Sequence, residues 1–274
     1  MMHGKKLSIR QLASIAILAA IAMMSAGCDF RSIRPGEEPS GPHFTVMTYN
    51  VNYGMPGAAE AAEAILQGDA DIVCLQETTP RWQAYLAGKL SGKYPHRSYK
   101  HGGAAGGMAF LAKRPFRQVT QTSPKAGWFP SWIIEADTPL GPVQICNVHL
   151  RPQLSDRGSF IPTAYFNTPD IHRREISEAY GEMDDSRPAL IVGDFNESDS
   201  GGGMAWLAER GFKDALSQFN TSAKTWRWKT SLITLKNRFD HVMYSSDLRA
   251  ISAWVIDKGK SDHLPLVAII ERAK

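Results

Sequence analysis

The sequence predicts an α/β fold in which a mixed, largely antiparallel β-sheet sandwich is flanked by helices. Three observations predict it. From residue 44 onward, short apolar runs alternate with helical patterns, the expected strands outnumber the expected helices, and some neighbouring strands are joined by tight turns. A doubly wound parallel sheet would need a long crossover between successive strands, and the tight turns argue against that arrangement.

Each expected element rests on a local pattern. The strands are short apolar runs bounded by polar or turn residues, and the helix after the first strand is alanine-rich. The sequence TPLGP at 138–142 concentrates turn residues between two such runs, so a hairpin is expected there. The expected strands cover residues 44–49, 71–75, 107–112, 132–136, 143–149, 189–192, 239–244, 251–256 and 264–270. The expected helices cover residues 58–67, 82–90, 173–183 and 204–210.

The amino terminus has the pattern of an export signal. A basic segment with Lys5, Lys6 and Arg10 precedes an apolar stretch over residues 12–24, which is too short for a membrane span and typical of a signal peptide. The sequence MSAGC that follows ends at Cys28 and resembles a bacterial lipobox. We therefore expect Cys28 to carry a lipid, and the protein to be an exported, membrane-anchored lipoprotein facing the periplasm or the cell exterior. An ordinary cleaved signal and an uncleaved anchor are the alternatives.

These signals divide the chain into three parts. Residues 1–27 are the expected signal peptide, and residues 28–43, rich in proline, glycine and charge, are an expected flexible tether. Residues 44–274 are long enough for one domain with a single core. The leader holds three basic residues and no acid, so its removal leaves 28 basic against 27 acidic residues. The domain is nearly neutral, and its charge is weak evidence for a nucleic-acid partner.

Two further cysteines, Cys74 and Cys146, each lie inside an apolar strand-like run. An exported protein can pair two such residues in a disulfide. Neither cysteine lies in a loop framework, and we therefore expect two buried free thiols, with a disulfide as the alternative.

Polar residues recur at the ends of the expected strands. Asn50 follows the first strand, Glu77 comes after the second, His149 closes the hairpin, and Asp194 follows the strand at 189–192. One such residue alone is most simply a turn former or a helix cap. Their recurrence along one chain indicates a site, because a rigid scaffold presents functional groups to solvent where strands end at a sheet edge.

Two local motifs strengthen this interpretation. Asp194 and Asn196 are separated by one residue, so an extended backbone would point both side chains the same way and turn the phenylalanine between them toward the core. An acid beside an amide can orient a water molecule and hold a phosphoryl oxygen. His263 follows Asp262, and a histidine next to carboxylates is suited to proton transfer near neutral pH, with Asp240 as a candidate second carboxylate.

Six segments, in order, resemble the endonuclease/exonuclease/phosphatase superfamily, whose members include deoxyribonuclease I, apurinic endonucleases, sphingomyelinases and inositol polyphosphate phosphatases. The segments are MTYNV with Asn50, LQE with Glu77, NVHL with His149, GDFN with Asp194 and Asn196, RFDHVMYS with Asp240, and SDHLPL with Asp262 and His263. The resemblance covers essentially all of residues 44–274. It implies a deoxyribonuclease I-like, four-layered α/β sandwich of two mixed, mainly antiparallel sheets packed face to face with helices outside.

The resemblance also implies how a metal and a water molecule would be held. Glu77, helped by Asn50, would bind Mg²⁺ or Mn²⁺, because these ions prefer hard oxygen ligands. Asp194 would orient or deprotonate the attacking water. Asn196 and the metal would together stabilise charge on the phosphoryl oxygens.

By the same resemblance, two histidines would act on the phosphate. His263, oriented by Asp240, would be a general acid or an electrostatic stabiliser, and Asp262 would hold His263 or a second metal. His149 would give a further phosphate contact. Some nuclease members pair the equivalent of His149 with a glutamate on a neighbouring strand, but the expected strand at 107–112 reads GMAFLA and has no acid. This departure argues against a two-histidine mechanism like that of deoxyribonuclease I.

Together these residues predict a divalent-metal-dependent hydrolase of phosphate esters that acts as a monomer. The leading hypothesis is a phosphodiesterase of nucleic acid or of a phosphorylated lipid headgroup. One alternative is a phosphomonoesterase of sugar or inositol phosphates, and another is a non-catalytic binding module on the same fold. The intact set of Glu77, Asp194, Asn196, Asp240 and His263 argues against the binding module.

Three other segments have both a structural and a functional interpretation. The aromatic sequences WFPSW at 128–132 and WRW at 226–228 can stack bases or touch lipid, although packing is the commoner use of such residues. The segment HGGAAGG at 101–107 lacks the lysine and serine of a phosphate-binding loop, so an ordinary loop is expected. Residues 152–169 are expected to form a long loop near the site.

Overall fold

The computed structural model describes residues 36–123, 125–153, 162–231 and 233–274, and of residues 162–167 only the backbone. The expected signal peptide, Cys28 and residues 29–35 lie outside the described residues. Among the residues described, none of the helices combines the length and the apolar character needed to cross a membrane.

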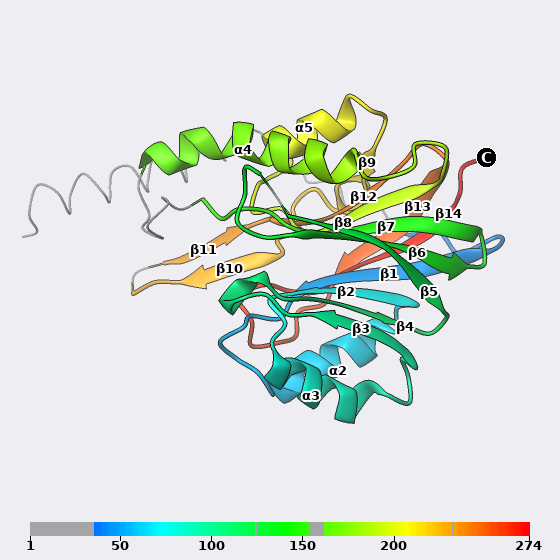
Figure 1. Cartoon of the computed structure of the whole chain (residues 1–274), viewed down its shortest axis with the longest axis horizontal. Helices are drawn as coiled ribbons and strands as arrows, with labels where there is room; N and C mark the ends of the chain where they lie inside the picture. The colour runs from blue at the N-terminus through cyan, green and yellow to red at the C-terminus, as the bar shows by residue number, and fades with distance from the viewer. Residues whose placement is uncertain (1–35, 124, 154–161, 232) are drawn as a thin grey trace, which may run out of the picture.

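Two six-stranded sheets form the body of the molecule (Figure 1). The first has the order β13 (Leu248–Val255), β14 (Leu266–Arg272), β1 (His43–Asn50), β2 (Ile72–Gln76), β4 (Met108–Ala112), β3 (His96–Lys100). The second has the order β5 (Phe116–Thr122), β6 (Ser131–Thr138), β7 (Gly141–His149), β8 (Ala189–Asp194), β12 (Asp240–Tyr244), β9 (Lys213–Asp214). A separate two-stranded ribbon consists of β10 (Trp226–Lys229) and β11 (Thr234–Asn237). Each large sheet is antiparallel apart from one central parallel pair, β1 with β2 and β7 with β8.

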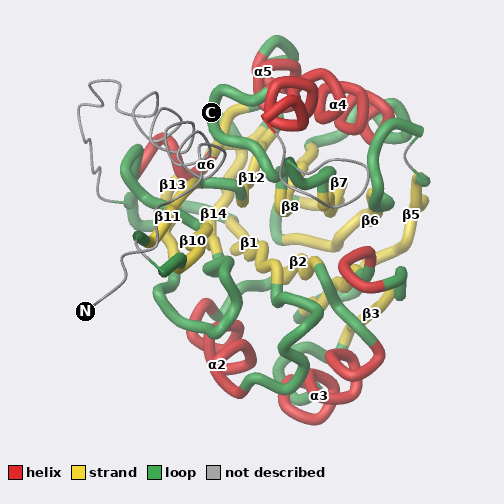
Figure 2. Tube along the Cα trace, turned by 90° about the vertical axis from the view of Figure 1, so that its left-hand side faces the viewer, coloured by secondary structure: helices red, strands yellow, loops and turns green. Residues whose placement is uncertain are grey.

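Helices cover the outer face of each sheet. The helices α2 (Ala59–Gly68) and α3 (Pro80–Leu90) cover the first sheet, while α4 (Pro162–Tyr180) and α5 (Gly202–Ala208) cover the second (Figures 1 and 2). Two short segments, α6 (Ala215–Phe219) and the 3₁₀ turn η1 (Ala104–Gly106), complete the helices described. Between the sheets lies the main core, where Phe110 and Trp132 pack edge to face with ring centroids 4.9 Å apart. The expected four-layered sandwich is confirmed.

Local sequence explains where the helices over the first sheet begin and pack. Thr79 caps α3, because its side chain accepts a hydrogen bond from the Trp82 backbone N–H at 3.2 Å, and Pro80 occupies the first turn. The Trp82 side chain is fully buried under the sheet. In α2 the fully buried residues include Ala64 and Ile65, so the alanine-rich face packs against the sheet as a small-residue surface.

The structure differs from the sequence expectation at the sheet edges and in α4. The hairpin expected across residues 138–142 is confirmed as β6 and β7. The edge strands β3 and β5 are not predicted, because each is polar and only partly buried along its length. α4 begins at Pro162, inside the segment expected to be a loop, and Pro169 lies within it. Proline removes one backbone donor, but its fixed φ is compatible with a helix, so Pro169 did not mark the boundary that the sequence suggested.

The end of the expected tether lies against the domain. The Glu37 backbone N–H donates to the Ile251 carbonyl oxygen at 2.7 Å, and the Glu37 carboxylate pairs with Arg249 at 3.0 Å. The Ser40 backbone N–H donates to the Glu271 carboxylate at 3.0 Å. Residues 37–43 therefore belong to the folded domain.

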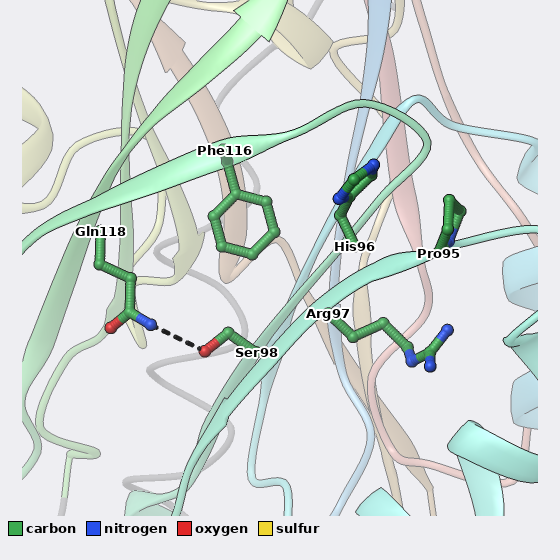
Figure 3. A pocket seen from close by; sticks show the side chains of 6 residues that line it. All are labelled: Pro95, His96, Arg97, Ser98, Phe116 and Gln118. Atoms are coloured by element: carbon green, nitrogen blue, oxygen red, sulfur yellow. Dashed lines mark hydrogen bonds between the residues drawn. The ribbon is translucent and has the colours of Figure 1, made fainter.

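A surface hollow of about 550 Å³ lies where the edge strands β3 and β5 approach each other (Figure 3). Gln118 Nε2 donates to Ser98 Oγ across it at 3.1 Å. The residues that line it are Pro95, His96, Arg97, Ser98, Phe116 and Gln118. Because none of these is a carboxylate or a predicted site residue, the hollow is an open seam between the sheets and not a candidate catalytic cleft.

Cys74 and Cys146 are both buried and unpaired. Cys74 lies in the core between the sheets, whereas Cys146 lies in the core beneath α4 and α5. The prediction of two buried free thiols is confirmed.

Candidate active site

The predicted site residues meet at one edge of the sandwich. Because β1 and β2 run parallel, Asn50 at the end of β1 lies beside the end of β2, which Glu77 follows. Because β7 and β8 also run parallel, His149 and Asp194 are register partners at their carboxyl ends. β12 runs antiparallel to β8 and begins at the same edge, where Asp240 is the register partner of Asp194. Strand topology alone therefore gathers five of the predicted residues.

Asp194 lies at the centre of these contacts. Its Oδ2 accepts a hydrogen bond from Asn50 Nδ2 at 3.0 Å, and it lies 3.5 Å from His149 Nε2 and 3.4 Å from His263 Nε2. Asn50 Nδ2 also donates to Glu77 Oε1 at 3.0 Å. A single carboxylate oxygen is thus in contact with groups from both sheets.

Asp240 holds the imidazole of His263. His263 Nδ1 donates to Asp240 Oδ2 at 2.9 Å, and the Asp240 backbone N–H donates to Thr225 Oγ1 at 3.0 Å. Ser261 Oγ donates to the Asn50 carbonyl oxygen at 2.8 Å and accepts the His263 backbone N–H at 3.1 Å. The loop that carries His263 is therefore fastened to the end of β1.

Burial and the neighbouring carboxylates set the charges of these groups. Burial would lower the pKa of His263, but the charges of Asp240 and Asp194 outweigh it and raise this pKa to about 10, so the ring is an imidazolium. Burial raises the pKa values of Asp194 and Glu77 above those of exposed carboxyl groups. Burial also lowers the pKa of His149. The two histidines therefore differ in charge at neutral pH.

Asn196 is placed differently from the sequence expectation. β8 ends at Asp194, and Asn196 adopts a φ of 49°, so the backbone is not extended through both residues. The Asn196 backbone N–H donates to Asp194 Oδ1 at 2.9 Å, while Asn196 Nδ2 donates to the Leu150 carbonyl oxygen at 2.9 Å. The expected parallel orientation of the two side chains is wrong, because the Asp194 carboxylate caps a turn that begins at its own strand end. Phe195 is fully buried, as expected.

Asp262 lies beside the site and binds neighbours other than the His263 ring. Its Oδ1 accepts a hydrogen bond from Asn52 Nδ2 at 3.0 Å, and its Oδ2 accepts one from Trp226 Nε1 at 3.1 Å. Trp226 in turn packs on Phe239, with ring centroids 5.0 Å apart. In the structure, Asp262 thus ties the ribbon of β10 and β11 to the loop after β1.

A buried polar bridge joins the two sheets beneath the site. Gln76 Nε2 donates to Asn147 Oδ1 at 2.7 Å, and Asn147 Nδ2 donates to the Leu75 carbonyl oxygen at 3.1 Å. Close approach of β7 and β8 depends on Gly193, whose φ is 147° and where a Cβ would lie 1.9 Å from the Val148 carbonyl oxygen. Glycine has no Cβ and adopts a positive φ readily, so it permits both the backbone conformation and the close approach.

Aromatic and backbone groups form one wall of the site. The Phe129 ring stacks on His149 with centroids 4.2 Å apart and planes 20° apart. His149 Nδ1 donates to the Ala105 carbonyl oxygen at 3.2 Å, so in the neutral ring Nε2 faces the site without a proton. The Arg151 guanidinium lies over the Trp128 ring, 4.8 Å from its centroid. Both the glycine-rich loop and the 128–132 segment therefore contribute to the wall.

Sequence reasoning missed the residues that hold the site together from outside it. Asn52 and Ser261 carried a usable signal, since each lies within two residues of a predicted site residue and has a hydrogen-bonding side chain. Thr225 carried none, because it lies 15 positions before Asp240 and meets it only through the fold.

The donor set fits a hard divalent cation. Carboxylate oxygens of Glu77 and Asp194 converge on the same Asn50 amide nitrogen, each at 3.0 Å. Ligand atoms of Asp194, Asp240 and His263 also lie within 4.8 Å of one another, and Asp240 Oδ1 is buried without a hydrogen-bond partner among the described residues. Buried carboxylates gathered around a single imidazolium leave a local excess of negative charge, and oxygen ligands of this kind suit Mg²⁺ or Mn²⁺.

A second acid–histidine group, formed by Asp199, Asp214 and His241, already has a cationic partner. The buried Arg238 guanidinium lies 3.0 Å from Asp199 Oδ2 and 3.7 Å from Asp214 Oδ2. His241 Nδ1 lies 3.4 Å from Asp214 Oδ1, so each carboxylate already faces a nitrogen cation or donor and the group does not need a metal ion.

Solved structures with the same fold support this architecture. The endonuclease/exonuclease/phosphatase from Beutenbergia cavernae DSM 12333 gives a TM-score of 0.63 at 18% identity, covering 85% of this chain and 72% of that one. D. rerio TDP2 complexed with a single-strand DNA product gives 0.61 at 16% identity, covering 84% and 99%. An AP endonuclease from Archaeoglobus fulgidus gives 0.59 at 17% identity, covering 82% and 98%. At such identities the likeness shows the fold. A search of curated proteins finds no significant sequence match.

The sequence also matches a family model described as the Endonuclease/Exonuclease/phosphatase family over residues 47–263. The matched interval runs from the middle of β1 to the histidine held by Asp240, so it contains every strand end that meets at the site. It covers well over half of the chain. The chain therefore belongs to the endonuclease/exonuclease/phosphatase family.

Proposed function

We propose that the chain is a divalent-metal-dependent phosphodiesterase whose preferred substrate is a nucleic acid. The observation that carries the proposal is the meeting of Asn50, His149 and His263 around one carboxylate oxygen of Asp194, with Glu77 bound to the same Asn50 amide. This arrangement offers an acid–base pair and a cation site within a few ångströms of each other, in a chain whose family is named for phosphate-ester chemistry.

Asp194 and His263 divide the proton transfers of hydrolysis. Asp194 orients the attacking water and takes its proton as the new P–O bond forms, and its raised pKa makes it a better base than an exposed aspartate. His263, held as an imidazolium by Asp240, stabilises the phosphoryl oxygens or passes its proton to the leaving oxygen as the old P–O bond breaks. His149 and Asn196 lie beside Asp194 and border the position of the phosphoryl group. A hydrogen bond from His149 Nε2 to a phosphoryl oxygen requires a proton on that nitrogen.

Glu77 and Asn50, with Asp194 beside them, would hold Mg²⁺ or Mn²⁺, which polarises a phosphoryl oxygen as a Lewis acid when bound. The side chains around this position are already ordered by hydrogen bonds. Glu77 Oε2 accepts the Tyr53 backbone N–H at 3.0 Å, and Asn50 Oδ1 accepts the Asn52 backbone N–H at 3.0 Å. Carboxylate oxygens of Glu77 and Asp194 are thus in place, whereas Asn50 turns its amide nitrogen toward them, so this amide has to rotate for its oxygen to bind a cation.

Two observations support nucleic acid as the substrate class. Structural relatives of the chain include TDP2, solved with a single-strand DNA product, and an AP endonuclease. Near the site, Trp128 is 37% exposed, and Trp228 is 59% exposed on the ribbon that Trp226 fastens to Asp262. Exposed aromatic faces can stack bases of any sequence. A lipid headgroup is the competing diester and is included in the test.

The test is a substrate panel assayed with Mg²⁺ or Mn²⁺. We expect turnover of bis-p-nitrophenyl phosphate and single-stranded DNA, loss of turnover on chelation with EDTA, and recovery when Mg²⁺ is returned. The panel also contains RNA, sphingomyelin vesicles, p-nitrophenyl phosphate and inositol phosphates. Faster cleavage of sphingomyelin than of DNA contradicts the substrate class, hydrolysis of monoesters alone contradicts the diesterase assignment, and full activity in EDTA contradicts the metal requirement.

The Glu77→Gln variant checks the cation site within the same assay. Even residues that only hydrogen-bond a metal's ligands typically contribute about 10–100-fold to metal affinity. Loss of the charge of Glu77, a proposed ligand, should therefore raise the Mg²⁺ concentration for half-maximal activity at least about tenfold. Glu63→Gln, on the exposed side of α2, is the matched control and should behave as wild type. An unchanged Mg²⁺ requirement in Glu77→Gln would remove Glu77 from the cation site.

We also propose that the protein is exported and anchored through a lipid on Cys28. The basic segment, the short apolar stretch and the MSAGC sequence support this. Metabolic labelling with palmitate should mark the wild-type protein and leave Cys28→Ala unlabelled. Cys74→Ala, which changes a buried thiol, should label as wild type does. Absence of label on the wild-type protein would refute the anchor.

A further inference from the structure

A buried acid–histidine cluster lies behind the site, and the proposed mechanism does not use it. It consists of His172 and Glu175 of α4 and of Glu197, which directly follows Asn196. The three residues are only 1–3% exposed. Burying ionisable side chains costs free energy unless each finds a partner, so the partners of this cluster show what it does.

Both α4 side chains bind the backbone of Arg151, two residues after His149. The two carboxylate oxygens of Glu175 accept the Arg151 backbone N–H, each at 3.2 Å. His172 Nε2 donates to the Arg151 carbonyl oxygen at 2.7 Å. Arg151 is thus held at both its N–H and its C=O, and only Leu150 separates it from the end of β7.

Glu197 holds the neighbouring strand end in the same way. Its Oε2 lies 2.9 Å from His172 Nδ1, and its Oε1 accepts the Met204 backbone N–H at 2.8 Å. The Glu197 carbonyl oxygen accepts a hydrogen bond from His241 Nε2 at 3.0 Å. Asn196, one residue earlier, donates to the Leu150 carbonyl oxygen at 2.9 Å. The segments that follow β7 and β8 are therefore tied to α4 and to each other.

The chemistry of His172 is defined by its partners. Its two ring nitrogens face a carbonyl oxygen and a carboxylate, which are both acceptors, so both nitrogens donate and the ring is an imidazolium. Burial would lower the pKa of His172, but the hydrogen bond and charge of Glu197 outweigh it and raise this pKa. Burial raises the pKa of Glu175 to about 7.

Glycines leave room for the two carboxylates. A Cβ at Gly127 would lie 1.6 Å from Glu175 Oε1, and a Cβ at Gly201 would lie 2.2 Å from Glu197 Oε2. Gly127 directly precedes the segment whose Phe129 ring stacks on His149. Glu175 is thus packed against two segments that touch the same catalytic histidine.

We propose that Glu175, His172 and Glu197 are positioning residues that hold His149 and Asn196 in place around Asp194. Among the described residues, their contacts reach the catalytic groups through the Leu150–Arg151 backbone, the segment at residues 127–129 and the turn at residues 195–197. The kinetic part of this inference rests on the proposed phosphodiesterase function, and a second measurement tests it without activity.

The decisive pair of variants is Glu175→Leu and Glu175→Gln. Leucine removes the acceptor for the Arg151 N–H. We expect kcat to fall about tenfold or more, which is the usual loss when a residue that holds a reacting group in place is removed. KM should stay within about twofold, because no group that contacts substrate is changed. Glutamine keeps an acceptor oxygen, so kcat should stay within about threefold of wild type. Glu182→Gln, exposed in the turn after α4, is the matched control.

Hydrogen exchange at the Arg151 amide is the measurement that needs no substrate. This amide should exchange at least about tenfold faster in Glu175→Leu than in wild type or Glu175→Gln, since it loses its acceptor. If Glu175→Leu does not fold, Glu197→Gln replaces it, and the loss of the anion opposite His172 should lower kcat at least about threefold with KM unchanged. The proposal is overturned if Glu175→Leu, or Glu197→Gln in its place, keeps the wild-type kcat. It is also overturned if Glu175→Leu and Glu175→Gln lose kcat equally, or if exchange at the Arg151 amide is unchanged in Glu175→Leu. A wild-type protein without diesterase activity refutes the proposed function alone, because the exchange result still decides the positioning role.

Discussion

Asp194→Asn is expected to lower kcat by about 10³-fold or more, within the range of measured losses of a catalytic base. Three hydrogen-bond donors face the carboxylate: Asn50 Nδ2, the Asn196 backbone N–H and the protonated His263 Nε2. In either orientation, the asparagine amide places an NH₂ group against one of these donors. The variant also loses the charge that accepts a proton from water.

Folding should survive this substitution. Burial raises the pKa of Asp194, which means that its charge is costly in the folded protein, and asparagine removes that charge at nearly the same volume. We expect the free energy of unfolding in EDTA to fall by no more than about 1 kcal/mol, measured by urea denaturation. Asp137→Asn, at a carboxylate whose side chain is 59% exposed on β6, is the matched control and should keep wild-type kcat. A folded Asp194→Asn enzyme with more than a tenth of wild-type kcat would exclude Asp194 as the base.

His263→Gln is the second change with a large expected effect, again about 10³-fold in kcat. Glutamine keeps a polar group beside Asp240, but it carries no positive charge and no proton that can be transferred to a leaving oxygen. His96→Gln, on the edge strand β3, is the matched control and should keep wild-type activity. Activity of His263→Gln near that of the control would show that the imidazolium is dispensable.

The same variant has an expected pH signature in stability. The pKa of His263 is raised from about 6.5 to about 10 in the folded protein, so its contribution is fully present below pH 6.5 and is lost as pH rises toward 10. The difference in free energy of unfolding between wild type and His263→Gln should therefore be largest at pH 6.5 and shrink at pH 8 and 9.5. Urea denaturation in EDTA measures it. A difference that does not change with pH would mean that the folded-state pKa is not raised.

Much of the site was predictable from the sequence because its residues occupy the ends of apolar strands. A short buried run precedes each of Asn50, Glu77, His149 and Asp194. Because strands end at the edges of their sheet, residues that follow strands are expected at such an edge. The Asp240–His263 contact was a hypothesis from residue type, which the family resemblance strengthened. No local pattern links the two residues, because 23 positions separate them.

Other features depended on packing that no local pattern encodes. β3 and β5 are polar strands that form because the backbones of β4 and β6 offer them hydrogen-bond partners. Their side chains lack the apolar run that predicts a strand from sequence. The orientation of Asn196 depended on a hydrogen bond between its own backbone and Asp194, which overrides the alternation of an extended strand. The carboxylate of Asp262 turned toward Asn52 and Trp226, because those donors come from elements that only the fold brings near.

The sequence by itself predicted a mixed α/β sandwich and the types of residue gathered at the site, and the resemblance of its six segments implied the family and the four layers. The spacing of apolar residues and the polar residues at strand ends are local properties, so they can be recognised in one sequence. The tertiary structure alone decided which atoms meet. It brings groups of both sheets to one carboxylate oxygen of Asp194. It also places Glu175 and His172 of α4 in hydrogen bonds with the Arg151 backbone, two residues after His149. Hydrogen bonds form between groups that are close in space, and residues 24 positions apart, such as Arg151 and Glu175, have no reason to be close until the layers have packed.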